Sequence, residues 1–119
     1  MPKFAMKFSY TSGSWARMLS LSDDRTEAVT ALMEHLGGKL DAMYWEVEHA
    51  AAYVIGDLPD SVSAAAAITA ATRTGAFKDV EVHQLLHQDQ LREVVALARS
   101  LEHVYRPPGV AAFDRDEFD

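Results

Sequence analysis

The residues from Gly37-Gly38-Lys39 to Asp57-Leu58-Pro59-Asp60-Ser61 are the most informative about the fold of this chain. The double glycine ends a helix, because glycine readily takes the left-handed backbone conformation that follows a last helical turn. Two runs with strand character follow, residues 39–47 and 51–58, separated by a tight turn. The Pro-Asp-Ser triplet then opens a second helix, since short oxygen-bearing side chains accept hydrogen bonds from the free amides of a first turn.

The residues before this stretch supply one more strand and the first helix. Residues 3–10 alternate between apolar and polar side chains, which predicts a strand with one apolar face. That face is formed by Phe4, Met6, Phe8 and Tyr10. A polar break at residues 11–14 and a short helical turn over residues 15–21 follow. Ser22-Asp23-Asp24 then starts the helix that the double glycine ends.

The residues after this stretch complete the pattern. An alanine-rich helix is predicted from residue 61 to residues 72–74, because alanine has the highest helix propensity. Residues 79–86 alternate again and predict a fourth strand. Asp89 is expected to cap a last helix, which ends before the Pro-Pro-Gly of residues 107–109.

The order strand, helix, strand, strand, helix, strand predicts a ferredoxin-like α+β sandwich of the βαββαβ type. Right-handed crossovers place the first and third strands in the middle of an antiparallel four-stranded sheet, with both helices on one side. The last helix is an addition at the C-terminal end. We therefore expect one ferredoxin-like domain over residues 1–103 and an acidic C-terminal tail over residues 104–119.

Composition argues against several classes of protein. The 119 residues fit a single domain, and the net charge is −7 with few, scattered lysines and arginines. Nucleic-acid binding needs a basic face, so no nucleic-acid partner is expected. No apolar run approaches the roughly 20 residues that cross a bilayer, so no membrane partner is expected. The absence of cysteine agrees with a reducing compartment, and a cytoplasmic location is the expectation.

Cofactor and catalytic motifs do not stand out. The double glycine follows a helix rather than a strand, so it is a helix cap and not a phosphate-binding loop. His83 and His87 are four residues apart, but they run from a strand into a loop, which spoils the geometry that a metal site needs. No serine lies in a Gly-x-Ser-x-Gly setting. We therefore expect neither a cofactor nor a metal.

Several short segments together are similar to the GYD domain family. They are Met1-Pro2-Lys3-Phe4, Ser9-Tyr10-Thr11, Leu36-Gly37-Gly38-Lys39-Leu40, Tyr44 and Asp57-Leu58-Pro59-Asp60. The resemblance runs over about residues 1 to 95, and the chain departs from the family pattern at residues 48–51, where it reads Glu-His-Ala-Ala. The resemblance implies a ferredoxin-like fold of the dimeric α/β-barrel type, whose members associate through their sheets, and a biochemical role that is essentially unassigned.

One face of the predicted sheet is left without a helix cover and carries the candidate site. Its polar side chains are predicted to be Lys7, Ser9, Tyr44, Glu46, Glu81 and His83. Lys7 on the first strand can meet Glu81 or His83 on the neighbouring fourth strand. In one interpretation these side chains form a solvated face or a wet subunit interface, with a modest ion pair between Lys7 and Glu81. In the other, the face closes over a cavity in which Lys7, Tyr44 and His83 bind a small ligand.

Three functions follow from these interpretations. The first is a small cytoplasmic homo-oligomer, a dimer or larger, that binds a small molecule or a protein partner through its open sheet face. The second is a cofactor-free enzyme of the monooxygenase or isomerase type, in which His83 is the acid–base group and Lys7 and Tyr44 orient the substrate. The third is an assembly protein that docks by its C-terminal tail.

Overall fold

The structure, a computed structural model, describes residues 1–21 and 23–110 and divides the chain into two units, residues 1–85 and residues from 86 onward. The first unit contains β1 (Lys3–Tyr10), α1 (Ser12–Leu21), α2 (Arg25–His35), β2 (Lys39–Glu46), the 3₁₀ helix η1 (Val47–His49), β3 (Ala51–Asp57), α3 (Ser61–Thr72) and β4 (Phe77–Leu85). The second unit contains α4 (Gln88–Ser100). This division falls before α4, whereas the sequence suggested a boundary after residue 103, which stays a prediction. Most of the acidic tail, residues 111–119, lies outside the described residues.

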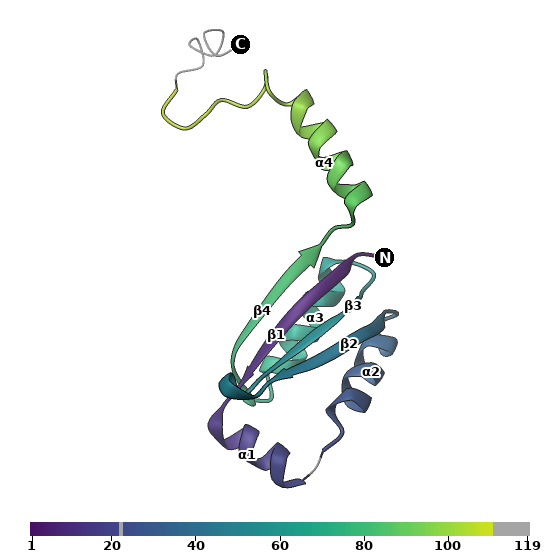
Figure 1. Cartoon of the computed structure of the whole chain (residues 1–119), viewed down its shortest axis with the longest axis vertical. Helices are drawn as coiled ribbons and strands as arrows, with labels where there is room; N and C mark the ends of the chain where they lie inside the picture. Colours follow the sequence, from purple (N-terminus) through teal and green to yellow (C-terminus); the bar gives the residue numbers. More distant parts are fainter. Residues whose placement is uncertain (22, 111–119) are drawn as a thin grey trace. The chain divides into compact units, whose positions relative to one another are not determined.

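The four strands form one antiparallel sheet in the order β2-β3-β1-β4 (Figure 1). The first and third strands occupy the middle, which confirms the predicted ferredoxin-like topology. Met6 on β1 lies opposite Val54 on β3 and Val82 on β4. The next residue along β1, Lys7, lies opposite Tyr53 and Glu81 and points to the other face, because successive side chains of a strand alternate.

The hydrophobic core lies between the apolar face of the sheet and the helices α2 and α3. Its buried members are Phe4, Met6, Met33, Val54, Leu58 and Ala64. Burying a large apolar side chain stabilises a fold by about 1.5–3 kcal/mol, so this face provides much of the stability of the first unit. α2 packs nearest β2 and α3 nearest β4.

A glycine in β3 lets α2 approach the sheet closely. A Cβ atom on Gly56 would lie 2.7 Å from the Cε atom of Met33 and 2.4 Å from the carbonyl oxygen of Lys39. Only a residue without a side chain therefore fits under the fully buried Met33.

The helix ends follow the predicted signals. Asp24 accepts a hydrogen bond from the amide of Glu27 at 3.2 Å, and Asp60 accepts one from the amide of Ser63 at 2.8 Å. The bond from the backbone of Ser63 lowers the pKa of Asp60 below its ordinary value. Gly37 has a φ of 84° just after α2, which is the left-handed exit that the double glycine predicted.

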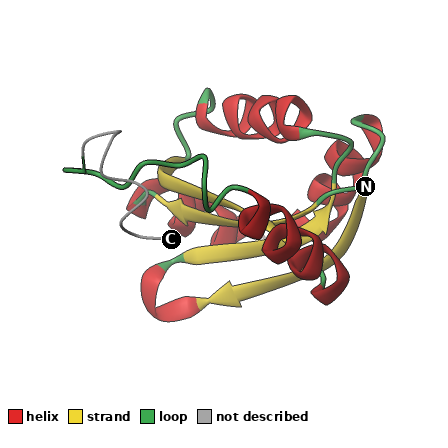
Figure 2. Ribbon diagram, turned by 90° about the horizontal axis from the view of Figure 1, so that it is seen from above, coloured by secondary structure: helices red, strands yellow, loops and turns green. Residues whose placement is uncertain are grey.

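Besides β4, which covers Phe77–Leu85 rather than the predicted residues 79–86, three predicted boundaries are wrong. α1 begins at Ser12 rather than at residue 15, because Thr11 accepts a hydrogen bond from the amide of Ser14 and so caps an extra turn. Val47 begins the 3₁₀ helix η1 instead of continuing β2, and Ala50, with a φ of 50°, closes that turn. Figure 2 shows this short helix joining two strands at one end of the sheet.

The third wrong boundary is the start of α4, which has His87 and not Asp89 at its N-cap. The amide of His87 donates to the side-chain oxygen of Gln90 at 2.8 Å, so Gln90 supplies an acceptor for the backbone amide at the N-cap of α4. Asp89 instead lies in the first turn of the helix. Among the described helices, none combines the length and the apolar character needed to span a bilayer.

Candidate functional site

The open face, defined as the sheet face opposite α2 and α3, carries the predicted polar residues. A row of paired positions crosses all four strands: Tyr44 on β2, Tyr53 on β3, Lys7 on β1 and Glu81 on β4. His83 is one position further along the same face of β4, opposite Ala5. The alternation of β1 and β4 therefore placed Lys7, Glu81 and His83 on the same flank.

Lys7 is the centre of this row. Its Nζ atom lies 3.9 Å from Oε1 of Glu46 and 5.6 Å from the centroid of the Tyr53 ring. Interaction with the side chain of Tyr53, followed by the negative charges of Glu46 and Glu81, raises the pKa of Lys7 above its ordinary value. Lys7 is thus a cation beside one aromatic ring, ion-paired with Glu46 and influenced by the charge of Glu81.

His83 lies beside this cation at the rim of the sheet. Its Nε2 atom is 3.5 Å from Oε1 of Glu81, and its side chain is 64% exposed. Together with Lys7 and Tyr53, these two residues line a hollow of about 340 Å³ on the open face. The hollow can take a small polar group, because it offers a cation, a carboxylate and an imidazole side by side.

The other predicted residues are only partly brought together. The carboxylate of Glu46 lies between Lys7 and His49, because its Oε1 atom also contacts Nδ1 of His49 at 2.8 Å. Ser9 is buried and lines a separate hollow of about 380 Å³ near His49 and η1. Tyr44 is 63% exposed and lines neither hollow, since Tyr53 stands between it and Lys7. The predicted group of Lys7, Tyr44 and His83 is therefore not one convergent cluster.

Tyr53 was missed as a site residue. Residues 51–58 are nearly all apolar, so their pattern does not say which face each side chain takes. The pairing of β1 with β3 would have found it, because Tyr53 is the partner of Lys7.

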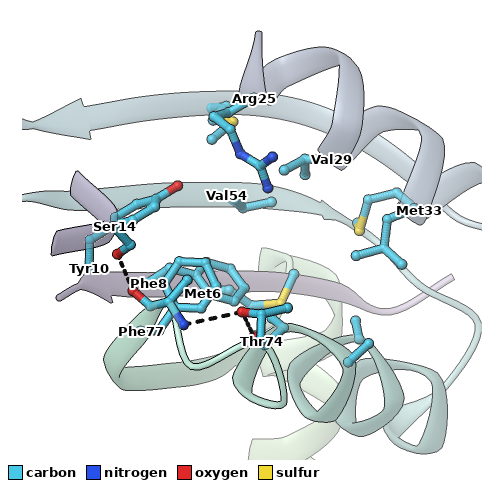
Figure 3. Close-up of a pocket in the computed structure, with 16 residues that line it drawn as sticks. Met6, Phe8, Tyr10, Ser14, Arg25, Val29, Met33, Val54, Thr74 and Phe77 are labelled. Atoms are coloured by element: carbon cyan, nitrogen blue, oxygen red, sulfur yellow. Dashed lines mark hydrogen bonds between the residues drawn. The ribbon is translucent and has the colours of Figure 1, made fainter. Parts of the chain in front are cut away.

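A second candidate site, here named the helix-side cavity, lies between the sheet and the helices α2 and α3 (Figure 3). Its volume is about 370 Å³, within the range of about 300–1,000 Å³ that small-molecule pockets occupy. Side chains of the core form most of its wall, among them Met6, Met33, Met43, Val54, Ala67 and Ala71. The sequence did not predict it, because each of these residues reads as ordinary core.

Polar groups gather at one end of the helix-side cavity, on Tyr10, Ser14 and Arg25. Figure 3 shows the hydroxyl of Tyr10 and the guanidinium of Arg25 facing the same space. Burial raises the pKa of Tyr10, and the neighbouring Arg25 offsets part of that effect. Ser14 is already satisfied, because its Oγ atom donates to the carbonyl oxygen of Ala76 at 2.5 Å.

An aromatic cluster holds Tyr10 in place at this end. The Tyr10 ring lies 4.8 Å from that of Phe77, 5.6 Å from that of Trp15 and 6.1 Å from that of Trp45, centroid to centroid. Such contacts add about 0.5–1.5 kcal/mol per pair beyond burial. The hydroxyl of Tyr10 is therefore fixed in position rather than free to turn into solvent.

No metal centre is apparent in the part of the chain that the structure describes. Within residues 1–21 and 23–110, no three histidine, aspartate or glutamate side chains are grouped so that they could hold a metal ion. Among the described residues, the ion pair found for His83 is with one carboxylate, that of Glu81.

The antiparallel sheet, its strand order and its helix-covered face define an α+β protein of the ferredoxin-like class. The chain belongs to the GYD domain family, whose model, "GYD domain", matches residues 4–95. It is also similar in structure to an uncharacterized NIPSNAP domain protein from Burkholderia xenovorans. That pair is 10% identical, with a TM-score of 0.48 over 73% of this chain and 94% of the other. No curated protein matches the sequence.

Proposed function

We propose that the protein is a non-enzymatic homo-oligomer that assembles through its open face and holds a small molecule there. The observation that carries this proposal is the row Tyr44, Tyr53, Lys7 and Glu81, which puts two aromatic rings and an ion-paired cation across the face opposite α2 and α3. Tyrosine is enriched in subunit interfaces because its ring buries apolar area while its hydroxyl stays hydrogen-bonded.

The charges of the open face suit contact with a second copy. In a two-fold interface the same surface serves both partners, so residue i meets residue j and residue j meets residue i. Lys7 stands between Glu46 and Glu81, so this surface carries both signs of charge within a short distance. A second copy can therefore set one of its carboxylates against Lys7 across the interface.

Binding is favoured over catalysis by the setting of His83. An acid–base group works best where water is excluded and where a neighbour holds the ring in position. The contact between Nε2 of His83 and Oε1 of Glu81 is a long 3.5 Å, so this neighbour holds the ring only loosely. A cytoplasmic location stays a prediction.

Charge reversal at the centre of the row tests the proposal. The variant Lys7→Glu places a third carboxylate between Glu46 and Glu81, so it should repel a second copy and shift the protein to monomer. Arg73→Glu, at the C-cap of α3, makes the same change of charge away from the open face and should leave the oligomer intact. Light scattering separates the outcomes: a Lys7→Glu protein with the wild-type mass would reject the open face as the interface.

A further inference from the structure

We propose that the helix-side cavity is a binding site for an apolar monocarboxylate, whose hydrocarbon part lies against Met6, Val54 and Ala71 and whose carboxylate meets Arg25 and Tyr10. This site is on the opposite face of the sheet from the open face. The inference therefore goes beyond the proposed function and does not depend on it.

Small side chains on α3 leave the space in which the hydrocarbon lies. Ala67, Ala70 and Ala71 face the cavity where larger residues would fill it, while Val29 and Leu32 of α2 form the opposite wall. Three methionines, Met6, Met33 and Met43, also contribute to the lining. Methionine has a flexible, polarizable side chain that adapts to ligands of different shape.

The mouth of the cavity lies between the two helices. Leu32 on α2 and Ala70 on α3 both line the cavity, and both are exposed to solvent. Arg25, at the start of α2, is partly exposed as well. A ligand can therefore enter between α2 and α3 without unfolding the core.

The polar end selects the charge of the ligand. Arg25 is always cationic and presents five N–H donors, and a fork of this kind fits a carboxylate. One donor of the guanidinium is already used, because Nη1 of Arg25 lies 3.1 Å from Oδ2 of Asp23. A ligand would bind the other donors. Tyr10 adds a hydroxyl that can donate to the same carboxylate.

Other ligand classes fit less well. A neutral hydrocarbon would cover the N–H donors of Arg25 that Asp23 does not occupy and give them no acceptor, which costs free energy. A cation would be repelled by the same group. A volume of about 370 Å³ is near the small end for ligand pockets, which favours a medium-length fatty acid or a compact aromatic acid over a larger lipid.

Isothermal titration calorimetry with three probes of equal chain length tests the charge selection. Decanoate, decanol and decylamine share one hydrocarbon tail and differ in the head group. We expect decanoate to bind the full-length protein about tenfold or more tightly than decanol, because hydrogen bonds between ionised partners are stronger than those to a neutral hydroxyl. Trp15 and Trp45 lie beside Tyr10, so their fluorescence should change on binding. 1-Naphthoate, run in parallel, separates aromatic acids from fatty acids.

Two variants assign the binding to the cavity. Arg25→Gln should weaken decanoate binding about tenfold or more and leave decanol binding nearly unchanged, whereas Arg25→Lys should keep much of the affinity. Arg17→Gln on α1, which removes an exposed arginine outside the cavity, is the matched control. Ala71→Leu fills the cavity and should weaken both ligands. Circular dichroism spectra and melting curves confirm that each variant is folded.

Three results would overturn the inference. The first is a failure of decanoate and 1-naphthoate to bind at concentrations up to about 1 mM, a weak affinity even for a small ligand. The second is equal binding of decanoate to wild type and to a folded Arg25→Gln protein. The third is full binding to Ala71→Leu, which would place the ligand elsewhere. Light scattering on the same samples measures the oligomeric state separately. A lack of ligand binding in the helix-side cavity can therefore be told apart from a lack of assembly through the open face.

Discussion

Lys7 on β1 lies directly opposite Tyr53 on β3, and its Nζ atom is 5.6 Å from the centroid of the tyrosine ring. This distance is within the range of about 6 Å over which a cation is attracted to an aromatic face. The pair sits in the two central strands, so it marks the middle of the open face. A second copy that covers this face would bury both side chains together.

Tyr53 should therefore matter more to association than to folding. The variant Tyr53→Ala removes the ring at the centre of the proposed interface, and truncated aromatic anchors commonly weaken an interface by about 2 kcal/mol or more, near thirtyfold in the dissociation constant. Tyr53→Phe keeps the ring and should assemble nearly as the wild type does. Sedimentation velocity over a dilution series measures both. Unchanged association of Tyr53→Ala would show that the open face is not the contact surface.

Gly56 should tolerate no side chain. An added Cβ atom would meet Met33 and the backbone of Lys39, so Gly56→Ala should lower the free energy of unfolding by about 1–3 kcal/mol through overpacking. Gly13, inside α1, has no atom within 4 Å of such a Cβ, and Gly13→Ala should be neutral or stabilising by up to about 1 kcal/mol. Urea unfolding followed by circular dichroism measures the two. Equal effects would mean that α2 does not press on β3 as described.

Met33 should be costly to truncate. It is only 1% exposed and packs between α2 and the sheet, so Met33→Ala should destabilise the fold by about 2–5 kcal/mol. Leu19→Ala, at a position of α1 that is 60% exposed, should change stability by about 0.5 kcal/mol or less. Chemical denaturation of both proteins in one buffer makes the comparison. If the two variants lost similar stability, the assigned core would be incorrect.

Asp60 should make stability depend on pH in the acid range. Its pKa in the folded protein is below the ordinary value of 3.8, so its charged form stabilises α3 fully above that pH. The contribution is lost as the pH falls from 3.8 through the lower folded value. Asp60→Ala should therefore be less stable than wild type at pH 7, and the difference should shrink below pH 3.8. Asp60→Asn keeps the cap without titrating, so its stability relative to Asp60→Ala should not follow this trend. A wild-type to Asp60→Ala difference that does not vary with pH would exclude the cap as the cause.

Much of the topology could be predicted from the sequence, because it depends on local signals. Each helix end depends on one residue and the backbone next to it, as at the caps Asp24 and Asp60 and at Gly37, where α2 ends. The alternation in β1 likewise fixed which side chains share a face with Lys7. Thr11 was missed as a helix cap because it begins a polar run, residues 11–14, whose composition is typical of a loop.

The two candidate sites were less accessible to sequence reasoning. Tyr53 joins the site only through the register of β1 with β3, which a uniformly apolar strand does not reveal. The helix-side cavity depends on how far α2 and α3 stand apart above Val54, a tertiary distance that no local pattern encodes. Ala71 belongs to the helix that alanine propensity predicted, but propensity does not show that it lines open space.

The molecular mass in solution shows whether the chain assembles through its open face. Multi-angle light scattering of the purified chain at micromolar concentration, together with the Lys7→Glu variant, gives the answer in one experiment. Assembly through the open face predicts a wild-type mass of at least twice the 13.1 kDa of one chain, and a mass near 13.1 kDa for the variant. A wild-type protein that runs as a 13.1 kDa monomer under these conditions would contradict it.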